Sequence, residues 1–297
     1  RTAASTMKHI ETIREMQSLA LGWKRSGLSI ALVPTMGALH AGHVSLIKCA
    51  CQSVQLSGKV VVSIYVNPLQ FSPNEDLTKY PRDLQKDIRI CQEAGADAVF
   101  TPTDSLMYPF EEKSFCPGLK HSTYAVEETL TQSMEGVARP THFRGVTTIV
   151  AKLFNIVLPD YAVFGNKDFQ QAAVIQRMVR DLNFPVQIIR APIIREDDGL
   201  ALSSRNIYLS AEERQSALCL NQAIKKAKEI TSKAALPAEE MRLELKTFIE
   251  KNPDTKVDYI EFFNPETLSP VSLVSTGTQI ALAVFVGKTR LIDNDTL

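Results

Sequence analysis

Short apolar runs alternate with amphipathic stretches along the first two thirds of the chain. The apolar runs indicate buried strands at 29–33, 60–66, 97–100, 161–164 and 186–190. The amphipathic stretches indicate helices at 8–21, 44–56, 83–94, 145–157 and 169–181. Regular alternation of strand and helix predicts a parallel sheet, and therefore an α/β domain of the Rossmann-like kind.

The pattern changes after Pro192. Helices are indicated at 211–231 and 237–250, and apolar strands follow at 257–263 and 279–286. This order predicts a smaller C-terminal α+β domain. We therefore expect two domains, over residues 1–191 and 192–297. Residues 104–126 contain two prolines and a glycine, and are expected to form an irregular excursion or a short hairpin.

Composition narrows the possible partners. The chain has 297 residues, of which 44% are hydrophobic, and this is enough for substantial cores. Its 33 Lys and Arg balance 33 Asp and Glu, so we expect binding neither to nucleic acid nor to membrane. There is no apolar run of transmembrane length and no secretory signal in residues 1–7, so we expect a cytoplasmic protein. Five irregularly spaced cysteines indicate reduced, packed thiols.

The segment Val33–His43, VPTMGALHAGH, carries the strongest chemical signal. It connects a strand to a helix, and His40 and His43 stand where helix-terminal N–H groups lack partners. Such a terminus attracts phosphate, and the histidines add donors for a developing negative charge. We interpret the turn as a nucleoside triphosphate site. A solvated histidine pair is one alternative, and zinc is disfavoured because further ligands at a suitable spacing are lacking.

Polar residues follow two other strands. Asn67 and Gln70 come after the strand at 60–66 and suit hydroxyls or a carboxylate, although these residues taken alone favour a simple Asn-Pro turn. Lys167 lies at the corner after 161–164, where a lysine can contact phosphate. Asp168 can cap the next helix or accept from a ribose hydroxyl, and Gln171 lies one turn further on.

Three further groups could contact ligands. Ser203, Ser204 and Arg205 follow a turn and resemble a polyphosphate clamp, or simply a Ser-rich loop. Arg139 and His142 precede a helix and are placed to reach a small acidic substrate. Asp83 and Asp87 are spaced to hold Mg²⁺ through waters; we favour a solvated helix face for Asp83 and keep Asp87 as the metal candidate.

Six segments, in order along nearly the whole chain, resemble one family. They are VPTMGALHAGH at 33–43, VSIYVNPLQFSPNEDLTKYPRD at 62–83, RPTHFRGVTTIVAKLFN at 139–155, FGNKDFQQ at 164–171, REDDGLALSSRN at 195–206 and GKTRLIDN at 287–294. Together they resemble the pantothenate synthetase (pantoate–β-alanine ligase) family of the nucleotidyltransferase superfamily.

That resemblance implies a function and its residues. The expected reaction is ATP-dependent condensation of pantoate with β-alanine to pantothenate, through a pantoyl adenylate, with release of pyrophosphate and AMP. The resemblance gives His43 as the active-site histidine and Gln70 and Gln171 as the pantoate contacts. His40 and Lys167 are expected to be catalytic as well, because they would provide charge stabilisation around the triphosphate. Residues 1–191 would bind nucleotide and catalyse, residues 192–297 would form a lid, and two chains would form a homodimer. The implied ATP contacts are Met36, Gly37, Ala38, Leu39, His40, Ala41, Gly42, His43, Gly165, Asn166, Lys167, Asp168, Ile194, Leu202, Ser203, Ser204 and Arg205.

Three other functions share parts of the pattern. A nucleotidyltransferase that leaves the nucleotide on its product would need no amine-binding subsite. A class I aminoacyl-tRNA synthetase-like enzyme is disfavoured by the balanced charge and the lack of an anticodon-binding extension. A non-catalytic ATP-binding module is disfavoured, because the expected phosphate-contacting side chains are all present: His40, His43, Lys167, Ser203 and Arg205.

Overall fold

The computed structural model describes residues 6–54, 57–71, 77, 80–109 and 121–297. The chain divides into two compact units, one of Arg1–Gly165 with Gln171–Ala191 and one of Asn166–Gln170 with Pro192–Leu297. Residues 166–170, which the sequence pattern assigned to the first domain, cluster with the second unit instead.

The first unit contains the predicted parallel sheet. Its six strands lie in the order β1-β4-β3-β2-β5-β6, and every neighbouring pair is parallel. The strands are β1 (Lys8–Ile10), β2 (Ile30–Thr35), β3 (Lys59–Ile64), β4 (Ala98–Phe100), β5 (Tyr161–Gly165) and β6 (Gln187–Ala191). From β2 the chain continues to β3 and β4 on one side of that strand, and then crosses to β5 and β6 on its other side. The carboxyl ends of β2 and β5 therefore border the crevice where such sheets bind ligands.

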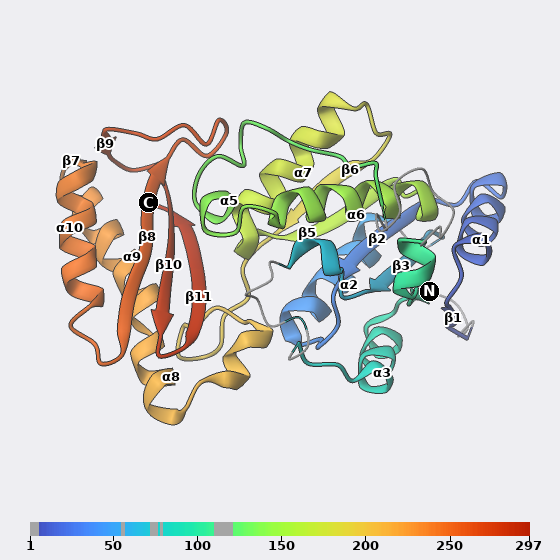
Figure 1. Cartoon of the computed structure of the whole chain (residues 1–297), viewed down its shortest axis with the longest axis horizontal. Coiled ribbons are helices and arrows are strands. Elements are labelled where there is room, and N and C mark those ends of the chain that lie inside the picture. The colour runs from blue at the N-terminus through green and yellow to red at the C-terminus, as the bar shows by residue number, and fades with distance from the viewer. Residues whose placement is uncertain (1–5, 55–56, 72–76, 78–79, 110–120) are drawn as a thin grey trace. The chain divides into compact units, whose positions relative to one another are not determined.

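Helices cover both faces of this sheet (Figure 1). Along β2, Ile30 and Leu32 pack into the core that includes residues of α1 (Ile13–Arg25), α6 (His142–Val157) and α7 (Phe169–Asp181). Ala31 and Val33 pack into the opposite core, with residues of α2 (Ala41–Ser53) and α3 (Leu84–Ala94). Burial on both sides explains why the strands are apolar throughout.

The structure modifies two predictions made from the sequence for this unit. Residues 8–10 form β1 and not the start of a helix, because they pair with Ala98–Phe100 and place Ile10 in the core. The helix begins only at Ile13, where the hydroxyl of Thr12 accepts the N–H of Glu15. Residues 104–126 begin with the short helix α4 (Asp104–Met107), and the expected hairpin falls largely on 110–120, outside the described residues. The remaining short helices are η1 (Pro68–Gln70) and α5 (Glu135–Ala138).

The second unit is the smaller α+β domain that the sequence predicts. Its antiparallel sheet has the order β11-β10-β8, and the core includes residues of α9 and α10. The expected helix at 211–231 is two helices that meet at Leu218. The elements of this unit are η2 (Asn166–Asp168), η3 (Ser204–Tyr208), α8 (Ala211–Ala217), α9 (Cys219–Thr231), β7 (Leu236–Pro237), α10 (Ala238–Ile249), β8 (Thr255–Phe263), β9 (Leu273–Val274), β10 (Gln279–Val286) and β11 (Thr289–Thr296).

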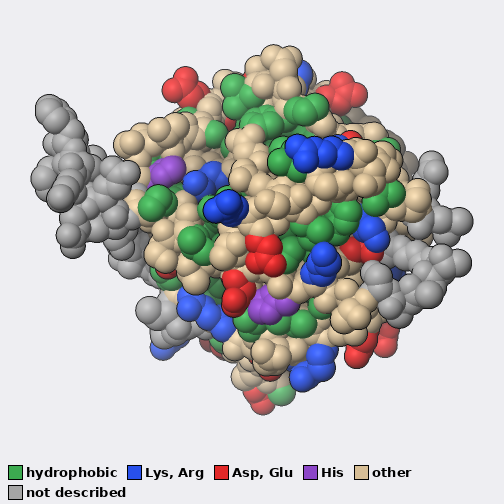
Figure 2. Space-filling model, turned by 90° about the vertical axis from the view of Figure 1, so that its right-hand side faces the viewer, with side chains coloured by type: hydrophobic (Ala, Val, Ile, Leu, Met, Phe, Trp, Pro, Cys, Tyr) green, Lys and Arg blue, Asp and Glu red, His purple; other side chains and the backbone are tan. Residues whose placement is uncertain are grey.

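The surface and the helices bear on possible partners. On the face viewed in Figure 2, described side chains of both charges lie interspersed among apolar and neutral ones. Among the described residues, none of the helices combines the length and the apolar character needed to span a bilayer.

Candidate functional site

The histidine turn begins where β2 ends. Thr35 Oγ1 donates to the carbonyl of Ser63 at 2.8 Å and accepts the N–H of Gly37 at 3.3 Å. Gly37 has a φ of +85°, and a Cβ there would lie 2.9 Å from Asp87 Oδ2. The turn therefore needs glycine at this position both for its conformation and for its packing.

Asp87 on α3 holds the same turn. Its side chain is 2% exposed, and its two oxygens accept the N–H groups of Ala38 at 2.9 Å and Leu39 at 2.8 Å. A carboxylate that accepts two backbone N–H groups is a strong anchor. The structure thus gives Asp87 a positioning role, and the magnesium contact expected from the sequence stays a prediction.

The two histidines form a paired cap on α2. His40 Nδ1 accepts the N–H of Gly42 at 3.1 Å, and His43 Nδ1 accepts the N–H of His40 at 3.3 Å. Their ring centroids lie 4.2 Å apart. Because each ring accepts through Nδ1, the neutral imidazole carries its proton on Nε2. The Gly42 N–H is therefore bonded within the turn, and each ring carries its N–H group on Nε2.

Asn67 and Gln70 follow β3, and the structure separates their roles. Asn67 is 1% exposed; its Nδ2 donates to Gln70 Oε1 and to the carbonyl of Gly145, both at 3.1 Å. Its Oδ1 accepts from Tyr108 Oη at 2.7 Å and from the N–H of Leu69 at 3.4 Å. All four hydrogen-bonding positions of this amide are used within the protein. Asn67 therefore supports Gln70 and is not itself a substrate contact.

Arg139 and His142 lie behind Gln70 as well. His142 Nδ1 donates to the main-chain carbonyl of Gln70 at 3.1 Å, and Arg139 Nη2 donates to the same oxygen at 3.4 Å. The His142 Nε2 lies 3.3 Å from Arg139 Nη1. These two side chains fix the backbone of Gln70, and their contact with an acidic substrate stays a prediction.

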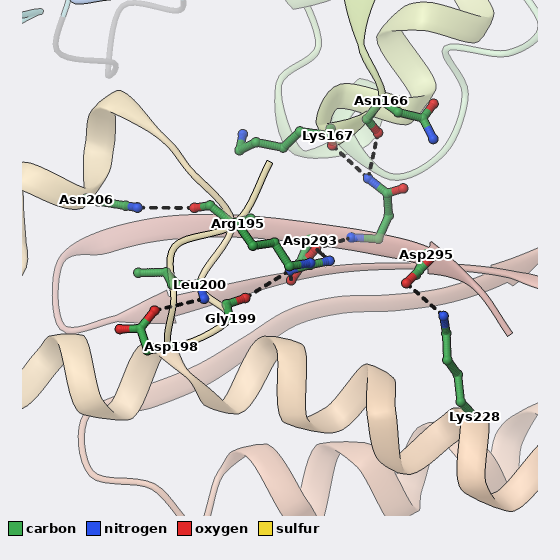
Figure 3. Close-up of polar contacts among 12 residues, drawn as sticks. Asn166, Lys167, Arg195, Asp198, Gly199, Leu200, Asn206, Lys228, Asp293 and Asp295 are labelled. Atoms are coloured by element: carbon green, nitrogen blue, oxygen red, sulfur yellow. Dashed lines mark hydrogen bonds and ion pairs between the residues drawn. The ribbon is translucent and has the colours of Figure 1, made fainter. Parts of the chain in front are cut away.

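In the second unit, β11 holds the lysine corner, which is the short helix η2 (Asn166–Asp168) that carries Lys167. Asn294 Nδ2 donates to the carbonyls of Asn166 at 3.0 Å and Lys167 at 2.8 Å. The Lys167 ammonium lies 3.9 Å from Asp168 Oδ1, and Figure 3 shows its side chain extending away from that of Asn166. Asn294 is 2% exposed and belongs to the GKTRLIDN segment, but nothing in that sequence pattern indicates its role.

A hairpin carries the second set of expected ATP contacts. The N–H of Leu202 donates to the carbonyl of Ile194 at 3.0 Å, and Ser203 Oγ caps η3 by accepting the N–H of Arg205 at 3.2 Å. Ser204 is the first residue of η3.

One ion pair fixes the base of this hairpin. Arg195 forms a bidentate pair with Asp293 of β11, at 2.6 and 2.8 Å (Figure 3). Burial lowers the pKa of Arg195, but the hydrogen bonds and charge of Asp293 outweigh it and raise the pKa above its usual value. Asp293 is 2% exposed, so the pair ties the hairpin to the interior of the second unit.

Three expected ATP contacts meet in one pocket of the second unit. Lys167, Ser203 and Arg205 line it, together with Asn206, Arg290 and Asp293. Cationic and hydroxyl side chains of this kind can contact phosphate oxygens. Gln171, by contrast, lies half-buried on α7 in the first unit, and Gly165 ends β5 there. The described residues contain no group of three or more His, Cys, Asp or Glu that could hold a metal ion.

Comparison with known proteins decides the family. The family model described as pantoate-beta-alanine ligase matches residues 8–296. This chain belongs to that family. A pantothenate synthetase of Ruminiclostridium cellulolyticum is 47% identical over 97% of this chain and 98% of its own length. That of Moorella thermoacetica is 48% identical over the same shares.

Solved structures of the family agree with the fold. The crystal structure of pantothenate synthetase from Thermus thermophilus has a TM-score of 0.85 at 41% identity, covering 98% of this chain and 99% of that one. A pantoate-beta-alanine ligase from Francisella tularensis, complexed with beta-gamma ATP and beta-alanine, has a TM-score of 0.79 at 32% identity, covering 98% of each chain. The Rossmann-like sheet and the smaller C-terminal domain of this pantoate–β-alanine ligase family member are thus confirmed.

Proposed function

We propose that this chain uses ATP to join pantoate to β-alanine, giving pantothenate, AMP and pyrophosphate. The observation that carries the proposal is the histidine turn at the switch point of the sheet. Asp87 accepts two N–H groups of its backbone, and the paired rings of His40 and His43 carry their N–H groups on Nε2. Family membership and the ATP and β-alanine of the Francisella tularensis complex support the choice of substrates.

The first half-reaction forms a pantoyl adenylate. A carboxylate oxygen of pantoate bonds to the α-phosphorus of ATP, the bond from that phosphorus to the bridging oxygen breaks, and pyrophosphate leaves. Because both reactants are anions, positioning and charge stabilisation must supply most of the catalysis. His40, His43 and Lys167 are proposed as the catalytic donors on the phosphates, with Ser203, Ser204 and Arg205 as further phosphate contacts.

The second half-reaction forms the amide. The amine of β-alanine attacks the activated carbonyl, its nitrogen loses a proton, and AMP leaves with the electrons of the carbon–oxygen bond. Gln70 and Gln171 are proposed to contact pantoate. The other proposed ATP contacts are Met36, Gly37, Ala38, Leu39, Ala41, Gly42, Gly165, Asn166, Asp168, Ile194 and Leu202.

Magnesium is proposed to enter with ATP as part of the substrate. Asp87 has both oxygens on backbone N–H groups, and no three-ligand group occurs among the described residues. Mg²⁺ commonly keeps several waters and binds mainly to substrate phosphates. The residues of this chain therefore fit a MgATP substrate better than a resident metal.

Three further expectations rest on the sequence and on the family resemblance. We propose a homodimer formed through the first unit, a lid role for residues 192–297 and a cytoplasmic location. Size-exclusion chromatography with light scattering tests the homodimer, and a monomeric mass at micromolar concentration would contradict it.

A stepwise assay tests the reaction. Pyrophosphate should appear only when ATP and pantoate are both present, and pantothenate only when β-alanine is added as well. Pyrophosphate release that leaves the nucleotide on the final product would identify a nucleotidyltransferase instead. ATP binding without pyrophosphate release would identify a binding module.

A further inference from the structure

A glycine of α6 lies against the backbone that carries Gln70. A Cβ built on Gly145 would lie 2.5 Å from the nitrogen of Gln70 and 2.5 Å from the carbonyl carbon and oxygen of Leu69. Side-chain carbons do not approach backbone atoms this closely, so any other residue would push α6 and η1 apart. Glycine weakens a helix interior relative to alanine, which means that its place here needs a packing reason.

The carbonyl of Gly145 also fixes the direction of a chain of hydrogen bonds. A carbonyl can only accept, so the group of Asn67 that faces it at 3.1 Å must be the Nδ2 amine. The other Nδ2 hydrogen then points to Gln70 Oε1 at 3.1 Å. Tyr108 Oη donates to Asn67 Oδ1 at 2.7 Å and reinforces the same orientation.

This arrangement decides which end of the Gln70 amide is presented. Because Oε1 is engaged by Asn67, the Nε2 amine is the end that remains for a ligand, and its neighbour is the weakly accepting sulfur of Met36 at 3.1 Å. Meanwhile His142 and Arg139 hold the main-chain oxygen of Gln70. Both the position and the polarity of Gln70 are therefore set by residues behind it.

We propose that Gly145 and Asn67 are positioning residues that make Gln70 a hydrogen-bond donor to the substrate. The substrate group at Gln70 must then be an acceptor, either a carboxylate or a hydroxyl oxygen, as pantoate carries. The identity of that substrate rests on the proposed function; the orientation of the amide does not.

Asn67→Asp tests the polarity. The new carboxylate would place an oxygen against both the Gly145 carbonyl and Gln70 Oε1, so the Gln70 amide should turn over and present its oxygen. We expect the KM for pantoate to rise roughly 5- to 150-fold, the range for a lost buried hydrogen bond, with little change in the KM for ATP. Asn155→Asp is the control, because Asn155 is exposed on α6, the helix that carries Gly145, and the substitution adds the same charge.

Gly145→Ala tests the close approach. We expect a raised KM for pantoate, an unchanged KM for ATP, and a crystal structure with Leu69 and Gln70 displaced. Gly22→Ala is the control, since a Cβ on this α1 glycine meets nothing within 4 Å. Wild-type KM values for pantoate in folded Asn67→Asp protein, or an undisplaced Gln70 in the Gly145→Ala crystal, would overturn the proposal. Failure of the wild type to use pantoate would instead overturn the proposed function. The position of Gln70 in the Gly145→Ala crystal structure would still test whether Gly145 positions it.

Discussion

Asp87 is separated from the histidine turn by more than forty residues, yet both of its oxygens accept N–H groups from that turn. Ala38 and Leu39 are thereby held just before the cap of α2, and the rings of His40 and His43 follow directly. A single buried carboxylate thus fixes the backbone from which the two Nε2 donors extend. At the scale of the residue, precise placement of these donors depends on a side chain outside the motif.

Asp87→Asn should destabilise the first unit. The amide can accept only one of the two N–H groups through its oxygen, and its amine would face the other. We expect a loss of about 1–3 kcal/mol in the free energy of unfolding. Urea denaturation followed by Trp23 fluorescence measures this directly, because Trp23 is the chain's single tryptophan and lies in the first unit. Glu93→Gln, at an exposed position of α3, is the control; equal stability of the two variants would contradict the anchoring role.

His43→Ala should slow adenylate formation by roughly 10²- to 10³-fold, because one preorganised donor to the developing charge is lost. Pyrophosphate release under single-turnover conditions is the measurement. Lys48→Ala, exposed on the same helix, should leave that rate unchanged. A folded His43→Ala protein with a wild-type rate would remove His43 from the mechanism.

The sequence identified residues near the proposed site better than it identified their roles. Gln70 and Lys167 were placed at strand ends, where open α/β sheets bind ligands. Asn67 and His142 were assigned to the substrate because polar residues near strand ends and helix starts suggest ligand contact. Their partners, the carbonyls of Gly145 and Gln70, lie 78 and 72 residues away along the chain. Contacts over such separations leave no periodic signal.

At the scale of the element, β11 shows what a hydrophobic pattern misses. Two of its buried positions are Asp293 and Asn294, so the strand resembles a polar loop in sequence. Each has a structural reason to be polar: Asp293 pairs with Arg195, and Asn294 holds the carbonyls of Asn166 and Lys167. Strand β10, which is apolar along almost its entire length, was predicted without difficulty.

Asn294→Ala should release the lysine corner. Two carbonyls of η2 lose their shared donor, so Lys167 is held less firmly. We expect adenylate formation to slow more than the attack of β-alanine on preformed adenylate, because Lys167 is proposed to act while the triphosphate is present. Rapid-quench assays of each half-reaction separate the two effects. Asp295→Asn removes only a half-exposed ion pair with Lys228 and serves as the control; equal slowing of both half-reactions in Asn294→Ala would contradict this account.

At the scale of the whole molecule, each unit has a hydrophobic core of its own. The first unit buries apolar residues on both faces of its parallel sheet, and the second buries them between its antiparallel sheet and helices. Units with separate cores can in principle fold alone. The two-domain pattern was visible in the sequence because the order of strands and helices changes after Pro192. The sequence did not indicate that residues 166–170 belong to the second unit, because this depends on contacts with β11, such as the hydrogen bonds from Asn294 to Asn166 and Lys167.

Two buried thiols allow the stability of each unit to be measured in the same experiment. Cys91 lies in the first unit and Cys219 in the second, and both are 0% exposed. Burial raises the pKa of each thiol to about 12. At pH 8 both therefore stay protonated in the folded protein, and iodoacetamide, which reacts with the thiolate, should modify neither until its unit opens.

We expect Cys91 and Cys219 to become reactive at different urea concentrations, because separate cores need not lose their packing together. Brief iodoacetamide pulses across a urea series, followed by peptide mass spectrometry, would give one transition for each cysteine. The Cys91 transition should coincide with the change in Trp23 fluorescence, since both residues lie in the first unit. Asp87→Asn should then shift the Cys91 transition to lower urea and leave that of Cys219 in place. Transitions that coincide in the wild type and move together in the variant would mean that the two units unfold as one cooperative body.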